Sequence, residues 1–501
     1  MSSCILQALS DFFTSVRVRL VLKTLLIYSA LVGVILFLLI VLRLTKIPLK
    51  SLLNTIINAN NDYQIGHVSL WVRSLVIISF FVTCAVIIEV ALRLVFNYNN
   101  LLTTYYSVYF FLHTPYTDSW YVMVKALEHF DGLPGESVYE ALILKDTTKF
   151  QYPPSSLLIF DVPKRFLSLS YGQLVDLFNK ISWVCIPLLA IIFYSLVKKN
   201  AHYPSDHREI KPEIKKSRVV WIALFVSAIS VGTFYPILWS YQIGQIQTIM
   251  TMLTGLSLLA WQTKKYGIAG VLLSICCSFK PQWVVLVPWA IIRKQWSFLI
   301  SFSITSTAIF LITGAFYGFK NWLDYLKVLS LIGRVGESYV ANQSVNGLLH
   351  RLIMNGNNLE VTTNAFPPYH PTVYIVTLIT SILILGLAML WKRNKTPSLV
   401  EFAIVILSLT MASPVAWVHH YAVVYLFFAL VIPLTFIYKP LGKWSFVYLL
   451  ITYLLVSQNY GYIFAGLAKT HFNFLQSTIF FGIIMMLFYL YKLSQKQYEK
   501  L

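Results

Sequence analysis

The carboxylate of Asp118 is the first group along the chain whose setting suggests chemistry. It stands directly ahead of SWYVMVKALEHFDG, whose apolar residues recur every three or four positions, as in an amphipathic helix. Two interpretations are open: Asp118 or Thr117 caps this helix, or Asp118 is a general base near a membrane surface. Asp131, farther along the same segment, is an alternative base.

Basic side chains that could bind a phosphate follow later in the chain. Lys280 lies inside the apolar run 267–292. An ionisable group in such a run is a functional candidate by default, although a lysine can also extend its charged end to an interface. Arg351 stands on an amphipathic stretch after ANQS, and His419 and His420 stand together in SPVAWVHHYAVVYL. Taken alone, a histidine pair is more often structural than catalytic.

Amide and hydroxyl side chains accompany these charges. Gln245 and Gln247 lie in YQIGQIQ, and Asn342 and Gln343 lie in ANQSVNGLLHRLI. Tyr152 precedes two prolines, which favour an extended backbone. Together with the acid and the cations, these residues suit a lipid-linked phosphate substrate: an apolar groove for its tail, cations for its phosphate and a carboxylate for an acceptor hydroxyl.

The elements that position these residues are predicted to be membrane helices. Of the 501 residues, 57% are hydrophobic and 12% are charged, whereas a soluble chain carries about 25% charged residues. A spanning helix needs roughly 20 apolar residues. The sequence therefore predicts an all-α polytopic membrane protein with about eleven spans: 24–42, 74–96, 181–197, 219–237, 245–261, 297–317, 372–391, 399–412, 421–437, 444–457 and 476–492.

Basic residues orient these spans. The formal charge of +20 arises from short basic clusters between apolar runs, which is the signature of cytoplasmic loops. No basic soluble domain is apparent that would indicate nucleic-acid binding. The clusters predict cytoplasmic positions for 198–218, 392–395, 439–443 and the C-terminal tail. They predict outer positions for 98–180, 318–371 and 458–475. The orientation of the N-terminal span stays open, because basic residues flank it on both sides.

The apolar run 267–292 needs a different explanation. Lys264 and Lys265 precede it and Arg293 and Lys294 follow it. Both pairs can be cytoplasmic only if the run enters the membrane and returns as two half-helices. Lys280–Pro281 lies at its middle, and irregular backbone at membrane depth is tolerated beside protein or a wet cavity. We therefore predict a re-entrant hairpin that turns at Lys280.

The remaining features set limits on cofactors and domains. The five cysteines show no spacing typical of a metal site or a disulfide framework, so neither a metal nor another cofactor is expected. The first span is expected to be a retained helix and not a signal peptide. We expect residues 1–73 to form an N-terminal addition and residues 74–501 to form the main membrane domain with short amphipathic helices in its outer loops.

The ordered motifs resemble those of the polyprenyl-phosphate-dependent GT-C glycosyltransferases, in particular the bacterial family of mannosyl- and arabinofuranosyltransferases. The set spans about 118–420 and consists of Asp118, Phe150-x-Tyr152-Pro153-Pro154, Gly244-Gln245-x-Gln247, the alanine–glycine and lysine of 269–280, Asn342-Gln343-Ser344 with Arg351, and Ser413-Pro414-x-x-Trp417-x-His419-His420. Two features depart from the family: Gln247 stands where asparagine is usual, and two spans, not one, precede the first outer loop.

The resemblance implies an inverting transfer of a hexose or pentose, most simply mannose, from a polyprenyl-phosphate donor to a lipid or glycan acceptor. The site would face the non-cytoplasmic side of a bacterial plasma membrane. Asp118 would be the base, and Lys280, Arg351, His419 and His420 would bind the donor phosphate. Tyr152, Gln245, Gln247, Asn342 and Gln343 would contact substrate.

Two other functions fit parts of the pattern. A secondary transporter also has broken helices and buried ions, but it typically shows inverted repeats and a site near the bilayer midplane. A cell-envelope glycan polymerase or ligase would share the lipid-linked substrates, and an arginine-rich outer loop would be expected of it.

Overall fold

The described part of the chain is helical throughout. The computed structural model describes residues 16–57, 69–95, 103, 115–132, 137–145, 148–201, 216–360, 366–391, 397–461 and 463–499. Within these residues the β-bridges outside regular strands amount to an isolated antiparallel bridge between Asn342 and Trp417. The predicted all-α class of a polytopic membrane protein is confirmed.

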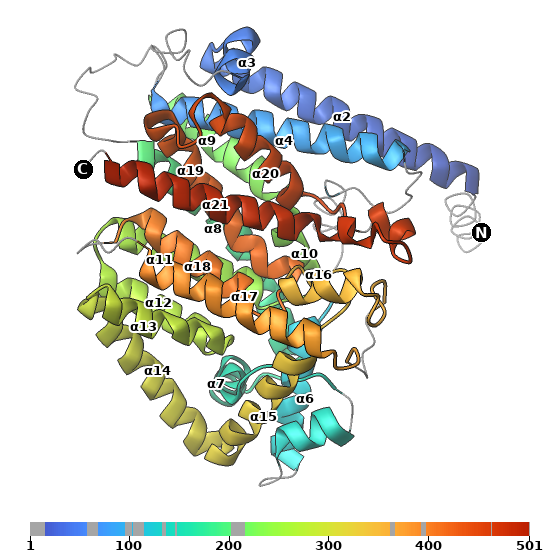
Figure 1. The fold of residues 1–501 in the computed structure, drawn as a ribbon, viewed down its shortest axis with the longest axis vertical. Coiled ribbons are helices and arrows are strands. Elements are labelled where there is room, and N and C mark those ends of the chain that lie inside the picture. Colours follow the sequence, from blue (N-terminus) through green and yellow to red (C-terminus); the bar gives the residue numbers. More distant parts are fainter. Residues whose placement is uncertain are drawn as a thin grey trace.

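Long apolar helices form the body of the molecule (Figure 1). They are α2 (Val16–Thr45), α4 (Leu70–Val95), α8 (Tyr171–Ala201), α14 (Trp296–Tyr317), α17 (Pro371–Leu390) and α21 (Thr478–Glu499), together with α19 (Val424–Tyr438), which is long when joined to the 3-10 helix before it. Shorter helices complete it: α3 (Leu49–Ile57), α9 (Lys216–Val231), α10 (Tyr235–Gln242), α11 (Gln247–Gln262), α12 (Tyr266–Cys277), α13 (Leu286–Ile292), α18 (Leu399–Met411) and α20 (Ser445–Ser457). Amphipathic helices lie within the two segments predicted to be outer, 98–180 and 318–371: α6 (Asp118–Gly132), α7 (Leu158–Leu167), α15 (Phe319–Val335) and α16 (Val345–Leu352).

The predicted number of eleven spans is not confirmed. Six described helices are long and apolar enough to cross a membrane, and two bent pairs raise the number to eight. These pairs are α2 with α3, bent by 100°, and α9 with α10, bent by 65°. The predicted spans 245–261, 399–412 and 444–457 correspond to helices of 16, 13 and 13 residues. An apolar run does not reveal where a turn shortens its helix, so the number of eleven spans stays a prediction.

The run 267–292 folds as the predicted pair of half-helices. Helix α12 ends at Cys277, Lys280 has an extended backbone, and the chain returns through a 3-10 helix, η4 (Pro281–Val285), and α13. The two ends of the run meet at the ring of Trp261, which lies 4.8 Å from the Tyr266 ring and 5.6 Å from the Trp289 ring between centroids. The helical hairpin is therefore confirmed, with Lys280 at its turn.

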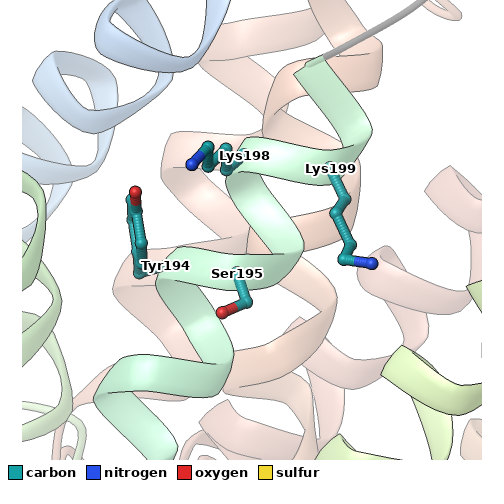
Figure 2. A pocket seen from close by; sticks show the side chains of 4 residues that line it. All are labelled: Tyr194, Ser195, Lys198 and Lys199. Carbon is teal, nitrogen blue, oxygen red and sulfur yellow. The ribbon is translucent and has the colours of Figure 1, made fainter. Parts of the chain in front are cut away.

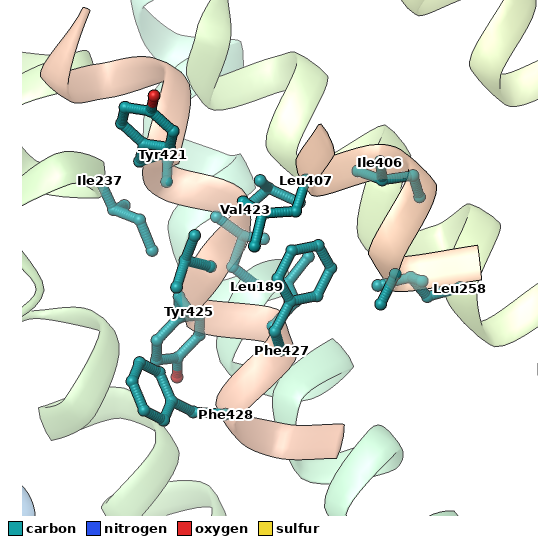
Figure 3. Packing of buried hydrophobic residues seen from close by; sticks show 14 of the residues in the cluster. Leu189, Ile237, Leu258, Ile406, Leu407, Tyr421, Val423, Tyr425, Phe427 and Phe428 are labelled. Carbon is teal, nitrogen blue, oxygen red and sulfur yellow. The ribbon is translucent and has the colours of Figure 1, made fainter. Parts of the chain in front are cut away.

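Helix α19 occupies the centre of the bundle. Its most apolar window is 94% buried, whereas the corresponding window of α17 is 17% buried and lies at the periphery. Figure 3 shows how side chains of α19 such as Tyr425 and Phe427 pack among residues of neighbouring helices, including Leu189 of α8. The 3-10 turn that precedes α19, η5 (Val418–Val423), carries both histidines. Dense packing of this helix thus holds the histidines in place.

Basic residues gather at one end of the bundle. Gln262 donates a hydrogen bond of 2.8 Å to Asn200, which brings the lysines after α11 to those that end α8. At the same end Arg293 donates to the Trp391 carbonyl and lies 3.8 Å from Glu401. Helix α3 packs on the 3-10 helix Gly442–Trp444, so the basic turn after α2 also lies there. This arrangement agrees with the alternation read from the sequence. The predicted cluster 392–395 lies outside the described residues.

Candidate active site

A cavity of about 900 Å³ lies at the opposite end from the basic clusters. The first outer loop, the turn before α11, the hairpin turn at Lys280, α15 and the segment before α19 form its wall. Its lining residues are Tyr116, Thr117, Asp118, Tyr121, Val122, Thr148, Lys149, Gln151, Tyr152, Trp239, Ile243, Gln245, Phe279, Lys280, Pro281, Gln282, Tyr325, Leu329, Ile332, Tyr339, Ala341, Ser413, Val415, Trp417, His419 and His420.

Backbone pairing places Asp118 in this wall. The N–H groups of Tyr116, Asp118 and Ser119 donate to the carbonyls of Gln242, Ile243 and Gly244, at 2.8, 2.8 and 3.1 Å. Gly244 permits this approach, because its φ is +68° and a Cβ there would lie 2.0 Å from the Tyr116 carbonyl oxygen. The start of α6 is thereby fixed against the turn that leads into α11.

Asp118 is an exposed residue whose carboxylate lines the cavity. Its Oδ2 accepts a hydrogen bond of 2.5 Å from Gln245 Nε2. Burial raises the pKa of the carboxyl, and the Gln245 bond and the positive charge of Lys280 partly reverse this rise. Within the described residues, no side-chain bond from Asp118 to the backbone of its own helix is found. The Asp118 side chain therefore bonds to Gln245 and not to the helix that Asp118 begins.

Gln245 connects three elements. Its Oε1 accepts hydrogen bonds from Ser119 Oγ at 2.7 Å and from the Tyr152 hydroxyl at 3.1 Å. Ser119 Oγ also accepts the N–H of Ile246 at 3.1 Å and lies 2.7 Å from the Tyr152 hydroxyl. The first outer loop, the Tyr152 segment and the start of α11 thus meet at one amide.

Lys280 and the histidine pair form another part of the wall. The ammonium of Lys280 donates to Gln247 Oε1 at 2.7 Å. His419 and His420 are both buried, and their ring centroids lie 4.7 Å apart. Lys280 interacts electrostatically with Asp118 and with both histidines. The structure therefore brings together the predicted acid, lysine and histidines at one cavity.

Four other predicted site residues lie behind this wall. Gln247 is buried and holds Lys280. Arg351 donates to the Ser477 hydroxyl at 2.7 Å and to the carbonyls of Tyr339 and Asn342.

Asn342 and Gln343 also have their bonds within the protein. The Asn342 amide bonds to the carbonyls of Glu337 and Pro414 and to the Ala416 N–H. The Gln343 amide donates to the carbonyls of Val340 and Gln476 and accepts the Phe480 N–H. These two residues, like Gln247 and Arg351, are not among those that line the cavity.

Other lining residues were not anticipated from the sequence. Lys149 lies 3.4 Å from Glu337 and 4.5 Å from the centroid of the Phe366 ring, at the cavity wall. Its position three residues before Tyr152 in the same extended segment was the available signal. Ser119, which is buried behind the wall and bonds to Gln245, was discernible only as the neighbour of Asp118. Trp417, which was singled out as part of a motif and not as a site residue, also lines the cavity.

Asp131, the alternative base, lies at the far end of α6. Its carboxylate bonds to Lys164 and to the Tyr171 hydroxyl, and these bonds lower its pKa. Half of its side chain is exposed. A helix of 15 residues separates it from the cavity, a distance of roughly 20 Å at 1.5 Å per residue.

A second cavity, of about 410 Å³, lies on α8 near the basic end (Figure 2). Tyr194, Ser195, Lys198 and Lys199 line it. Lys198 lies 5.6 Å from the centroid of the Tyr194 ring. No carboxylate or imidazole from the described part of the chain lines this cavity. Elsewhere in the described residues, no three His, Cys, Asp or Glu side chains converge as metal ligands would.

Comparison with known families decides the class of the protein. The sequence model of glycosyltransferase family 87 matches residues 150–414, which is more than half of the chain. The chain belongs to glycosyltransferase family 87. A search of curated proteins gave no significant match. Family membership makes the protein a membrane glycosyltransferase and lends no support to the transporter alternative.

The family match covers most of the cavity wall but not all of it. Tyr152, Gln245 and Lys280 lie inside the matched residues. Asp118 and the histidine pair lie outside them, so their roles rest on the geometry described above.

Proposed function

We propose that the protein transfers a sugar, mannose in the first instance, from a polyprenyl-phosphate donor to a lipid or glycan acceptor. The observation that carries the proposal is the cavity itself. One carboxylate open to solvent faces a buried lysine and two histidines across a single space, at the end of an apolar bundle.

The chemistry needs only these groups. Asp118 takes the proton of an acceptor hydroxyl, whose oxygen attacks the anomeric carbon as the bond from that carbon to the phosphate oxygen breaks. The electron pair leaves with the phosphate, which Lys280, His419 and His420 stabilise. A phosphate leaves without a general acid, so one carboxylate suffices, in contrast to the two of glycoside hydrolysis. Attack opposite the leaving group inverts the anomeric carbon.

The wider setting completes the proposal. Residues 74–501 form a catalytic domain of the GT-C type, and residues 1–73 are an N-terminal addition. The cavity opens on the non-cytoplasmic side of a bacterial plasma membrane, opposite the basic clusters. Arg351, Asn342 and Gln343 support the segment before α19, because their hydrogen bonds join it to the second outer loop and to the residues ahead of α21.

The test is sugar transfer by purified Asp118→Asn and Asp131→Asn. A general base contributes roughly 10²–10⁴-fold to rate, so Asp118→Asn should reduce transfer from a mannosyl polyprenyl phosphate by that factor and still fold. Asp131→Asn, the matched control at the other end of α6, should turn over normally. A cap would instead give about 1 kcal/mol of lost stability or less with turnover intact.

The donor class is tested in the same assay. Nucleotide-linked mannose should give no product in the absence of a polyprenyl-phosphate donor, and polyprenyl-phosphate arabinofuranose should be the second donor tried. Transfer from the nucleotide sugar alone would overturn the donor assignment. Loss of activity in Asp131→Asn but not in Asp118→Asn would move the base to Asp131.

A further inference from the structure

We infer that Gln245 and Gln247 are a pair of positioning residues in one turn, Gln245 for the carboxylate of Asp118 and Gln247 for the ammonium of Lys280. The inference rests on the proposed function, because it takes Asp118 as the base and Lys280 as the partner of the phosphate. It gives these amides a role different from the substrate contacts that the sequence suggested.

The orientation of the Gln245 amide is fixed from both ends. Ser119 and Tyr152 donate to its Oε1, so its Nε2 faces Asp118 Oδ2 at 2.5 Å. A reversed amide would place an oxygen against the carboxylate, where an acceptor cannot bond to an ionised acid. The fixed N–H therefore favours the ionised form of Asp118, which is the form that can accept a proton.

Gln247 positions the ammonium of Lys280. It is 4% exposed and does not line the cavity, so it reaches the site only through the ammonium that bonds to its Oε1. Its Nε2 lies 3.5 Å from Thr251 Oγ1, one turn along α11. A buried cation without a hydrogen-bond partner is costly, and Gln247 supplies that partner at the hairpin turn.

Gln245 and Gln247 belong to one short backbone segment that is itself held in place. Gln245 N–H donates to the Ser240 carbonyl at 2.9 Å, and α11 begins at Gln247. The residue before Gln245, Gly244, has a positive φ, and its carbonyl accepts the Ser119 N–H at the start of α6. A single short segment thus fixes both the base and the cation, and with them the separation between the attacking and the leaving oxygen.

The titratable groups around Asp118 define what a pH profile can report. Lys280 and Tyr152 interact with its charge directly. Lys149, His419 and His420 line the same cavity. If Gln245 favours the ionised carboxylate, its loss moves the acid limb of kcat/KM to higher pH, whereas a substrate contact would raise KM at every pH.

The experiment compares full-length Gln245→Leu, Gln245→Glu and Gln247→Leu, with kcat and the KM for the polyprenyl-phosphate donor measured across pH. Gln245→Leu should move the acid limb to higher pH and regain most of its activity in alkaline buffer. Gln245→Glu should move it further, because two adjacent carboxyls share a proton. Gln247→Leu, the matched substitution on the same turn, should raise the donor KM about tenfold or more, the usual loss for a hydrogen bond to a charged group.

Three results would overturn the inference. A uniform loss of activity at all pH values in Gln245→Leu would mean that Gln245 is merely structural. A raised KM with an unmoved acid limb would mean that it contacts substrate. An unchanged donor KM in Gln247→Leu would remove the second half of the pair.

Ser119→Ala and Tyr152→Phe keep the test decisive if Gln245→Leu does not fold. Each removes one hydroxyl that orients the amide and should move the acid limb in the same direction by less, and an unmoved limb in both variants would overturn the inference. Full activity in Asp118→Asn would instead overturn the proposed function. An inactive Asp118→Asn beside unmoved limbs in the Gln245, Ser119 and Tyr152 variants would overturn the positioning role alone.

Discussion

The side chain of Asp118 lies among groups that act on its charge in opposite directions. Burial raises the pKa of the carboxyl, and Gln245 and Lys280 reverse only part of that rise. An acid with a raised pKa in the folded protein destabilises the fold when it is ionised. Such a cost is typical of catalytic groups, which are retained for activity and not for stability.

Asp118→Asn should therefore melt at a higher temperature than the parent protein at neutral pH. The gain should shrink as the pH falls through the folded pKa and vanish below the unfolded carboxyl pKa of about 4, because both proteins are then neutral at this position. Asparagine keeps an oxygen that can accept from Gln245 Nε2. Thermal unfolding in detergent across this pH range measures the effect, and an equal difference at all pH values would contradict it.

For single residues, the sequence predicted which ones lie near the cavity but not the direction in which each side chain points. Asp118, Tyr152, Gln245, Lys280 and the two histidines all line the cavity. Arg351 was expected at the phosphate, yet its guanidinium donates to Ser477 and to backbone carbonyls. A motif fixes the end of the bundle at which a residue lies, whereas the direction of its side chain depends on partners that are distant in the sequence, such as Ser477.

The α12–α13 hairpin is the element that brings Lys280 to the cavity, and its return end is anchored at the other end of the bundle. Arg293 and Glu401 lie 3.8 Å apart with side chains 1% and 2% exposed. Glu401 also accepts the N–H of Ser398, the residue that caps α18. The pair thereby joins the end of the hairpin to the start of α18.

Glu401→Leu should destabilise the protein by about 3–5 kcal/mol, because it leaves a buried guanidinium without its carboxylate. The double variant Arg293→Met with Glu401→Leu should recover much of this loss, since neither charge is then buried alone. Denaturant unfolding in detergent measures both. Arg293→Met alone completes the cycle: if its effect and that of Glu401→Leu simply add in the double variant, the two residues are not coupled and the prediction is contradicted.

The hairpin also shows that basic residues flanking an apolar run can predict whether the run crosses the membrane or turns back. Basic residues on both sides of 267–292 predicted its return, and Trp261 indeed contacts both ends. Eight of the predicted spans correspond to described helices or bent pairs that pass as spans. The bends at α2–α3 and α9–α10 were not foreseen. The shortness of the remaining helices was not foreseen either, because the turns that bound them, such as the one at Gly244, depend on contacts with residues near Tyr116.

The whole molecule has two chemically different ends. Lysines and arginines follow helices at one end, and the cavity lies at the other. By the positive-inside rule the basic end is cytoplasmic, so the cavity should face outward.

Impermeant thiol labelling of intact cells should therefore modify Asn357→Cys and spare Lys264→Cys. Both positions are exposed at opposite ends of the described structure. Lys264→Cys should react after permeabilisation, and labelling of the unsubstituted protein gives the background. The reverse pattern would invert the orientation and would leave the arrangement of the cavity itself unchanged.

The hairpin turn at Lys280 has a consequence for biogenesis. Because both ends of the hairpin stay at the basic end, the ammonium reaches its place by travelling through the apolar layer and not by passing fully across it. A lone lysine at the centre of a membrane helix costs about 2.5–3.5 kcal/mol even on insertion scales. Gln247, its hydrogen-bond partner, lies on the helix that leaves the ribosome immediately before the hairpin. Because Gln247 precedes Lys280 in the chain, the hydrogen-bond acceptor is synthesised before the ammonium that bonds to it.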